Sequence, residues 1–352
     1  MTTAFEHFES LWRGMGRRVT EAAAQVNAQQ QGSPGCSSSE VVWREDKAVL
    51  YRYLPLPSVK PAGARPLLIC YALVNRPDVL DLEPERSLVR ALLATGLEVY
   101  LLDWGRPDPS DRGLELVDYI ERYLGGGIQY LLAAHRIRSI NLLGVCQGGT
   151  FSLCYCALHP QRVSRLVTMV TPVDFQTPED LLSKWARQLD TDAIAQSGNL
   201  SGAVLTGLFL ALRPFRLMQQ KYVDLLESHT DPAALETFCR MERWIFDSPD
   251  QAASALAQFV RWFYQENRLV GRTLQLGGSR VDLRNIRHPV LNIYADRDHI
   301  VPAAASTALR QHLRSRDYSE MRVDTGHIGM YVSRHCQQSV ASRIADWLLK
   351  GG

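Results

Sequence analysis

The chain has 352 residues, of which 46% are hydrophobic and 22% are charged, and its formal net charge is +2. This composition excludes a wholly disordered chain and supplies enough apolar residues for a large core. A charge so close to neutral gives no general case for nucleic acid binding.

The cysteines show no pattern of a metal site or of a disulfide framework. They lie at positions 36, 70, 146, 154, 156, 239 and 336, without a C-x-x-C pair or Cys/His ligand spacing. An odd number of cysteines in a chain of this size fits a reducing compartment. Residues 1–30 lack the apolar core of a secretory signal, and the most apolar window, residues 202–212, is too short to span a bilayer. These features predict a cytoplasmic protein without a bound metal.

The first 40 residues form the first predicted unit. Apolar side chains recur at helical spacing over residues 3–28, which predicts an amphipathic helix. Such a helix packs on its own domain, or it docks on a partner or an apolar surface, and the sequence favours neither. Residues 29–40 are rich in Gln, Ser and Gly, a composition typical of a linker.

Strand and helix patterns alternate after this linker. Residues 41–43 and 48–53 predict an antiparallel hairpin. The strand patterns that follow are residues 67–73, 98–104, 140–143 and 165–170, and the helix patterns between them are residues 86–93, 114–134, with a possible break at 125–127, and 150–158. This alternation predicts an α/β fold with a mostly parallel, doubly wound sheet, in which the hairpin supplies the antiparallel edge.

The alternation stops over residues 174–275. This segment has helical periodicity, many aromatic residues and no clear strand, which predicts a helical cap inserted into the sheet domain. We interpret its aromatic residues mainly as the core of the cap, because large aromatic side chains dominate protein cores.

The sheet pattern resumes after the cap. Residues 289–294 and 321–323 are strand-like, and residues 337–349 predict a closing helix. The α/β core is therefore predicted to comprise residues 41–173 and 276–352.

A candidate nucleophile lies where the strand pattern of residues 140–143 passes into a helix. The sequence there is Gly144-Val145-Cys146-Gln147-Gly148, which fits the pattern G-x-nucleophile-x-G. A sharp strand-to-helix turn needs small neighbours around the nucleophile, and it directs the first N–H groups of the helix at any anion formed there. A buried structural cysteine in a glycine-rich turn would show the same pattern. Other residues of the chain are therefore needed to distinguish a nucleophile from a structural cysteine.

An acid and a histidine follow two later strand patterns. Asp298 lies in DRDHIVP after residues 289–294, and His327 lies in DTGHIG after residues 321–323. The order nucleophile, acid, histidine is that of α/β-hydrolases, and open α/β sheets place their sites at the carboxyl ends of strands. The imidazole would take the proton of the Cys146 thiol, and the carboxylate would orient the imidazole. Asp296 is the rival acid, but Asp298 is preferred because it stands at the head of the turn into the next helix.

The remaining candidates concern the oxyanion and the substrate. The N–H of Gln147, directly after the nucleophile, is expected to be one oxyanion donor. The second is expected from Val74 or Asn75, in the loop after the strand pattern of residues 67–73. His299 contacts the substrate or simply packs, and the sequence does not separate these roles.

Several motifs together resemble one family. GVCQGG, LVTMVTPVDF, KYVDLLE, MERWIFDSPDQA, PVLNIYADRDHIVP and GHIGMYVS, with YALVNRPDVLDLEPERSLVRALLATGLEVYLLDWG upstream, are similar to the short catalytic subunit of class III polyhydroxyalkanoate synthases. The resemblance runs from about residue 42 to the C-terminus, and the first 40 residues carry little of it.

The resemblance implies an α/β-hydrolase fold and polymerisation of (R)-3-hydroxyacyl-CoA, chiefly 3-hydroxybutyryl-CoA, with release of CoA. Cys146 would carry the acyl group, His327 would activate the thiol, and Asp298 would assist His327 or activate the incoming hydroxyl. It implies no cofactor, because the CoA thioester is itself the substrate. The implied partners are a second subunit, PhaE rather than the class IV subunit PhaR, further copies of the chain, and the surface of polymer granules in the cytoplasm.

Two other functions remain open at this point. A cysteine-dependent α/β-hydrolase, such as a thioesterase or a dienelactone-hydrolase-like enzyme, would use the same three residues, so these residues do not separate it from a synthase. A non-catalytic scaffold on the granule surface is a third possibility, and the presence of Cys146, Asp298 and His327 argues against it.

Overall fold

The computed structural model describes residues 20–21, 24, 35–212 and 231–350. The helix predicted over residues 3–28 therefore lies almost entirely outside the described residues, as does the first part of the linker. Among the described residues, no helix is both long and apolar enough to cross a membrane.

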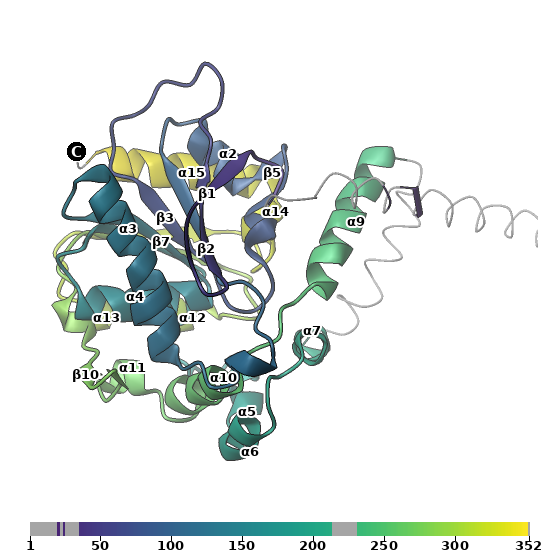
Figure 1. Ribbon diagram of the computed structural model, residues 1–352, viewed down its shortest axis with the longest axis vertical. Helices are drawn as coiled ribbons and strands as arrows, with labels where there is room; N and C mark the ends of the chain where they lie inside the picture. The colour runs from purple at the N-terminus through teal and green to yellow at the C-terminus, as the bar shows by residue number, and fades with distance from the viewer. Residues whose placement is uncertain (1–19, 22–23, 25–34, 213–230, 351–352) are drawn as a thin grey trace, which may run out of the picture.

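An eight-stranded sheet lies at the centre of the described fold (Figure 1), with the strand order β1-β2-β6-β3-β7-β8-β11-β12. The strands are β1 (Ser39–Glu45), β2 (Ala48–Tyr53), β3 (Leu67–Cys70), β6 (Val99–Asp103), β7 (Ile140–Val145), β8 (Val163–Met169), β11 (Val290–Ala295) and β12 (Tyr318–Val323). β2 pairs antiparallel with β1 and with β6, and the strands from β6 to β12 are parallel. The predicted parallel sheet and its antiparallel edge hairpin are confirmed.

Helices cover both faces of this sheet, so each face has its own core. α2 (Leu88–Leu93) and α15 (Arg334–Leu349) pack on one face, and α3 (Gly125–His135) and α4 (Gln147–Leu158) on the other. The smaller elements of the sheet domain are η1 (Pro77–Leu80), β4 (Asp81–Glu83), β5 (Arg86–Ser87), η2 (Pro109–Asp111), η3 (Asp118–Leu124), η6 (Leu283–Asn285), α12 (Ala303–Thr307), α13 (Leu309–His312) and α14 (Gly329–Val332). The central strands have no polar face because both sides are covered, which explains their continuous apolar runs.

The possible helix break at residues 125–127 takes a different form in the structure. η3 is a π-helical stretch that runs directly into α3, and the glycines form the first turn of α3. A Cβ on Gly126 would lie 2.7 Å from the Trp43 ring, so a glycine lets α3 approach β1 closely. These glycines serve helix–strand packing and do not end the helix.

The described chain between β8 and β11 is helical apart from one short hairpin. Its elements are α5 (Leu181–Ala186), α6 (Thr191–Gln196), α7 (Gly202–Ala211), α9 (Pro232–Phe246), α10 (Ala253–Phe259), the π-helical η5 (Val260–Gln265), α11 (Arg268–Gly271), and the hairpin strands β9 (Gln275–Leu276) and β10 (Ser279–Arg280). The expected helical character is confirmed.

The helical segment divides into two parts by the way it packs. Phe259 of α10 and Phe263 of η5 are buried in the main core, where Phe259 meets Phe151 of α4 with ring centroids 6.0 Å apart. α9, in contrast, lies beside the body of the sheet and contacts β4 and η1 (Figure 1). The later helices thus complete the core on the α3/α4 face of the sheet, whereas α9 contributes Trp244 to the core on the opposite face.

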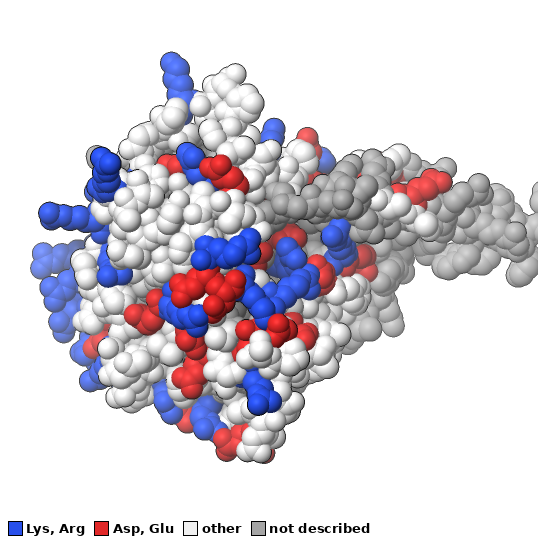
Figure 2. All heavy atoms as spheres, viewed as in Figure 1, with Lys and Arg blue, Asp and Glu red and all other residues white. Residues whose placement is uncertain are grey.

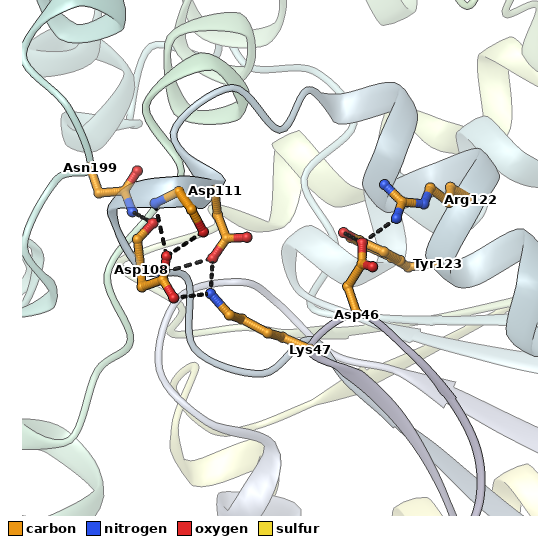
Figure 3. A network of polar contacts seen from close by, with 8 residues as sticks. Asp46, Lys47, Asp108, Asp111, Arg122, Tyr123 and Asn199 are labelled. Carbon is orange, nitrogen blue, oxygen red and sulfur yellow. Dashed lines mark hydrogen bonds and ion pairs between the residues drawn. The ribbon is translucent and has the colours of Figure 1, made fainter.

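A surface network ties the earlier helices to the sheet. Acidic and basic side chains are interspersed over the face that carries the β1–β2 hairpin (Figure 2). Within it, Lys47 of the hairpin turn pairs with Asp108 at 2.5 Å and with Asp111, and Asn199 Nδ2 donates to the Asp108 carbonyl at 2.6 Å (Figure 3). The Lys47 ammonium lowers the pKa of Asp108 to about 2, so this carboxylate stays charged at neutral pH.

Candidate active site

Cys146 lies in the turn between β7 and α4. Its backbone has φ 54° and ψ −126°, a conformation that L-residues rarely adopt and that is often found at functional sites. The turn is fixed on both sides, because Cys146 N donates to Met169 O at 2.9 Å and Gly149 N donates to Cys146 O at 2.9 Å. The residue as a whole is half-buried.

The glycines around Cys146 are required by close contacts. A Cβ on Gly144 would lie 2.4 Å from the Cα of Gly149, and a Cβ on Gly148 would lie 2.2 Å from the Cys70 carbonyl. Any side chain at these positions would push α4 away from β7 and β3. The glycines of the G-x-C-x-G pattern therefore hold the helix against the sheet, as the sequence predicts.

Asp298 and His327 meet at the carboxyl ends of β11 and β12. His327 Nδ1 lies 2.6 Å from Asp298 Oδ2, and the two side chains are 5% and 0% exposed. The other carboxylate oxygen of Asp298 accepts the N–H groups of Ile300 and Val301 at 2.8 and 2.9 Å. These bonds lock the carboxylate and leave Nε2 as the reactive nitrogen of His327.

The rival acid is directed elsewhere. Asp296 pairs with Arg322 on the neighbouring strand β12, and both side chains are partly exposed. His299 follows Asp298 and is half-buried. Asp298 is thus the acid that contacts His327.

Cys146 acts on the same imidazole. Burial lowers the pKa of His327, but the Asp298 carboxylate and the adjacent Cys146 side chain raise it, and the net shift is upward to about 10. Beside the Asp298 carboxylate, the imidazole is stabilised in its protonated form once it has taken the proton of the thiol. The three residues can therefore form a thiolate–imidazolium pair oriented by a carboxylate.

Tyr331 is a further residue at the site, which the sequence analysis missed. Its hydroxyl lies 3.0 Å from His327 Nε2, and the two rings meet edge to face with centroids 5.6 Å apart. Burial and then the nearby Cys146 raise the pKa of Tyr331 well above its ordinary value, so the phenol remains protonated. The available signal was the spacing of four residues after His327, which brings two side chains to one face of a helical turn.

The loop after β3 lies beside the nucleophile. Leu73 N donates to the side-chain oxygen of Gln147 at 3.0 Å, and Leu73 O accepts from Gln251 Nε2 at 2.9 Å. Asn75 N donates to Ser248 Oγ at 3.2 Å. Within the described chain, the N–H groups of Val74 and Gln147 donate no hydrogen bond, so they remain available to an anion.

No group of three or more His, Cys, Asp or Glu side chains among the described residues is arranged to hold a metal ion. The site consists of a thiol, an imidazole, a carboxylate and free N–H groups. This set is suited to acyl transfer through a nucleophilic cysteine.

The fold is shared with many hydrolases. A family profile described as alpha/beta hydrolase fold matches residues 65–333. A membrane phospholipase A of known structure superposes with a TM-score of 0.53 at 18% identity, covering 95% of this chain and 92% of its own. A hydrolase from Pseudomonas aeruginosa also gives 0.53 at 18% identity, covering 90% and 99%. At this identity the likeness concerns the fold alone.

The similarity to curated relatives is much higher. The poly(3-hydroxyalkanoate) polymerase subunit PhaC of Allochromatium vinosum is 50% identical over 315 residues, which cover 89% of this chain and 89% of the relative. The chain belongs to the PhaC family. The PhaC subunits of Thiocystis violacea, at 50% over 315 residues, and of a Synechocystis species, at 46% over 322 residues, cover 89% of this chain and 88% and 85% of their own. The α/β-hydrolase profile spans the part of the chain that holds Cys146, Asp298 and His327.

Proposed function

We propose that the chain polymerises (R)-3-hydroxyacyl-CoA, chiefly 3-hydroxybutyryl-CoA, into a polyester and releases CoA. The observation that carries this proposal is the 50% identity, over 89% of the chain, with a subunit named poly(3-hydroxyalkanoate) polymerase. The contact of His327 with Asp298 and its interaction with Cys146 supply a mechanism for it.

Loading would begin when His327 takes the proton of the Cys146 thiol. The thiolate attacks the thioester carbonyl of the substrate, and the oxygen of the resulting tetrahedral anion is stabilised by the N–H groups of Gln147 and Val74. Val74 is preferred over Asn75 because the Asn75 N–H already donates to Ser248. The C–S bond to CoA breaks, and the His327 imidazolium gives its proton to the departing CoA thiolate. The acyl group is held on Cys146 as a new thioester of nearly equal energy, and Nε2 is again free to accept a proton.

Elongation would use the same nitrogen of His327. The 3-hydroxyl of another unit gives its proton to Nε2 while its oxygen attacks the thioester on Cys146. An ester bond forms, the C–S bond breaks, and the Cys146 thiolate recovers a proton from the imidazolium. Water must be kept away from the thioester during this step, and residues 174–275 are proposed as the cap that excludes it.

The chain is proposed to act with a second subunit, PhaE, as a class III enzyme. The PhaC relatives are named as subunits, which supports a complex with another polypeptide. The proposed setting is the surface of polymer granules in the cytoplasm, with several copies of the chain. His299 is kept as a proposed substrate contact because it directly follows Asp298.

The decisive experiment is incubation of the purified chain with 3-hydroxybutyryl-CoA, with and without PhaE. Release of CoA together with insoluble polyester is the expected result. Release of CoA with free 3-hydroxybutyrate and no polymer would instead identify a thioesterase.

A further inference from the structure

Tyr331 shares the reactive nitrogen of the catalytic histidine. Nδ1 of His327 is bound to Asp298, so Nε2 is the nitrogen that serves Cys146, and the Tyr331 hydroxyl lies 3.0 Å from it. The adjacent Cys146 side chain raises the pKa of the same imidazole. Tyr331 therefore contacts the nitrogen that the proposed mechanism assigns to Cys146.

The partners of His327 Nε2 change during the reaction described under the proposed function. The inference rests on that proposed reaction. In the proposed mechanism the Cys146 thiol gives its proton to Nε2 in the free enzyme. Once Cys146 carries an acyl group, its sulfur has neither a proton nor a charge and is a poor hydrogen-bond partner. A buried imidazole that lacks a hydrogen-bond partner at Nε2 is destabilised, and it would be free to turn away from the thioester.

We propose that Tyr331 is a positioning residue that holds the His327 imidazole in place while Cys146 carries the acyl group. A hydroxyl suits this task because it can donate to a neutral nitrogen and accept from a protonated one. The same contact therefore survives both protonation states of His327. When the substrate hydroxyl arrives, the imidazole is already oriented to take its proton.

Tyr331 is itself held rigidly. Its side chain is fully buried, and its ring meets the Tyr71 ring edge to face at 6.2 Å. Its backbone carbonyl accepts a hydrogen bond from the Gln337 side chain of α15. Because the Tyr331 side chain is already held by these contacts, it loses little conformational entropy when its hydroxyl binds the imidazole.

The test is Tyr331→Phe, which removes only the hydroxyl. Rapid mixing with 3-hydroxybutyryl-CoA separates the first equivalent of CoA, released as Cys146 is loaded, from steady turnover. We expect the loading step to change less than threefold and steady turnover to fall about tenfold or more. Mass spectrometry of the quenched enzyme should show acylated Cys146 accumulating in the variant and not in the wild type.

The matched control is Tyr119→Phe. Tyr119 is also a buried tyrosine, but it lies in the core on the opposite face of the sheet. Its variant should keep the wild-type ratio of loading to turnover, which excludes a general effect of losing a buried hydroxyl.

Two results would overturn the proposal. One is that Tyr331→Phe keeps both rates at the wild-type level, and the other is that both rates fall by the same factor and no acyl-enzyme accumulates. The ratio can be measured whether the acyl group passes to a hydroxyl or to water. If the wild-type enzyme makes free acid, the polymerase function is refuted. The ratio of loading to turnover in Tyr331→Phe still tests the role of Tyr331 in that case.

Discussion

The backbone at Cys146 is strained, and its surroundings explain why it persists. A non-glycine residue in such a conformation costs about 1–3 kcal/mol, and the two backbone hydrogen bonds of the turn and the packing of Gly144 and Gly148 over-determine it. The strain lifts the thiol out of the sheet and leaves the N–H of Gln147 free. Substitutions of the Cys146 side chain therefore test its chemistry without disturbing the turn.

Cys146→Ala should abolish CoA release and acyl labelling, because no other thiol is held beside His327. Cys146→Ser should fall at least about a hundredfold below the wild type, since an alkoxide forms much less readily than a thiolate. Both rates can be followed by trapping free CoA. Substantial turnover by Cys146→Ala would refute the assignment of the nucleophile.

Asp298→Asn should lower the rate far more than Asp296→Asn. The first change removes the charged partner of His327 Nδ1, whereas the second removes a partly exposed pair with Arg322. We expect a loss of at least about a hundredfold for Asp298→Asn and less than threefold for Asp296→Asn, measured as kcat with 3-hydroxybutyryl-CoA. Equal losses would mean that the orienting acid is misassigned.

The same variant gives a test through stability. Because the folded pKa of His327 is raised, to about 10, above an ordinary value near 6.5, the folded state holds its proton more tightly. This stabilisation is fully present below about pH 6.5 and is lost as the pH rises to about 10. Between pH 6.5 and pH 10, the free energy of unfolding measured with urea should fall more steeply in the wild type than in Asp298→Asn. If it falls equally in both proteins, Asp298 is not the cause of the raised pKa of His327.

At the scale of single residues, the sequence predicts the site residues that directly follow strands. It does not predict contacts that depend on how two elements pack together. Cys146, Asp298 and His327 each follow an apolar strand pattern, so their proximity could be inferred from the sheet. The contact of the Gln147 side chain with Leu73 depends on how closely α4 approaches the loop after β3. Gly148 shows that α4 lies close to β3, but the local pattern does not specify the side-chain contact that follows.

At the scale of elements, the loop after β3 is connected to the helical segment. Asn75 donates to Ser248, and Leu73 accepts from Gln251, both of which follow α9. Trp244 of α9 donates to Arg76 O at 2.7 Å, so the next residue along the loop is also held. The position of the proposed second oxyanion donor, Val74, thus depends on the chain that leaves α9.

Ser248→Ala should therefore slow the chemical step. It leaves the Asn75 N–H without its acceptor and loosens the loop around Val74, at a cost of about 1 kcal/mol, or roughly fivefold in kcat. Ser201→Ala is the matched control, because Ser201 caps α7 and does not contact this loop. It should lower thermal stability while leaving kcat unchanged.

If both serine variants lower kcat equally, the effect belongs to the stability of the helical segment. If neither does, the Ser248 contact has no part in holding the loop. Only a selective effect of Ser248→Ala supports the coupling.

The sequence placed most strands and helices, and its errors are local. The predicted strand over residues 67–73 ends in the structure at Cys70, since the following residues turn to approach Gln147. The sequence predicts that the aromatic residues of the cap form mainly the core of the cap, but Phe259 and Phe263 complete the core of the sheet domain. Helical periodicity shows that a face is buried and does not show which partner buries it.

At the scale of the whole molecule, the two parts of the helical segment are expected to move differently. α10 and η5 are packed into the main core and cannot leave without opening it. The earlier helices are attached by side-chain contacts, such as Asn199 with Asp108 and Thr237 with Glu83 at 3.0 Å, and α9 also packs Trp244 into the core on the α2/α15 face. Any opening that admits CoA and a growing chain should therefore be confined to the part between β8 and α10.

We expect the isolated chain to be poorly active and PhaE to shift this part toward an open state. PhaE need not contact Cys146, because a ligand shifts an equilibrium only through its different affinity for the two states. Hydrogen exchange should become faster in α5, α6, α7 or α9 when PhaE is bound, while β7 and α10 remain unchanged. If PhaE raises activity while exchange in these helices stays the same, gating is refuted, and a direct contribution of PhaE to substrate or chain binding becomes the better explanation.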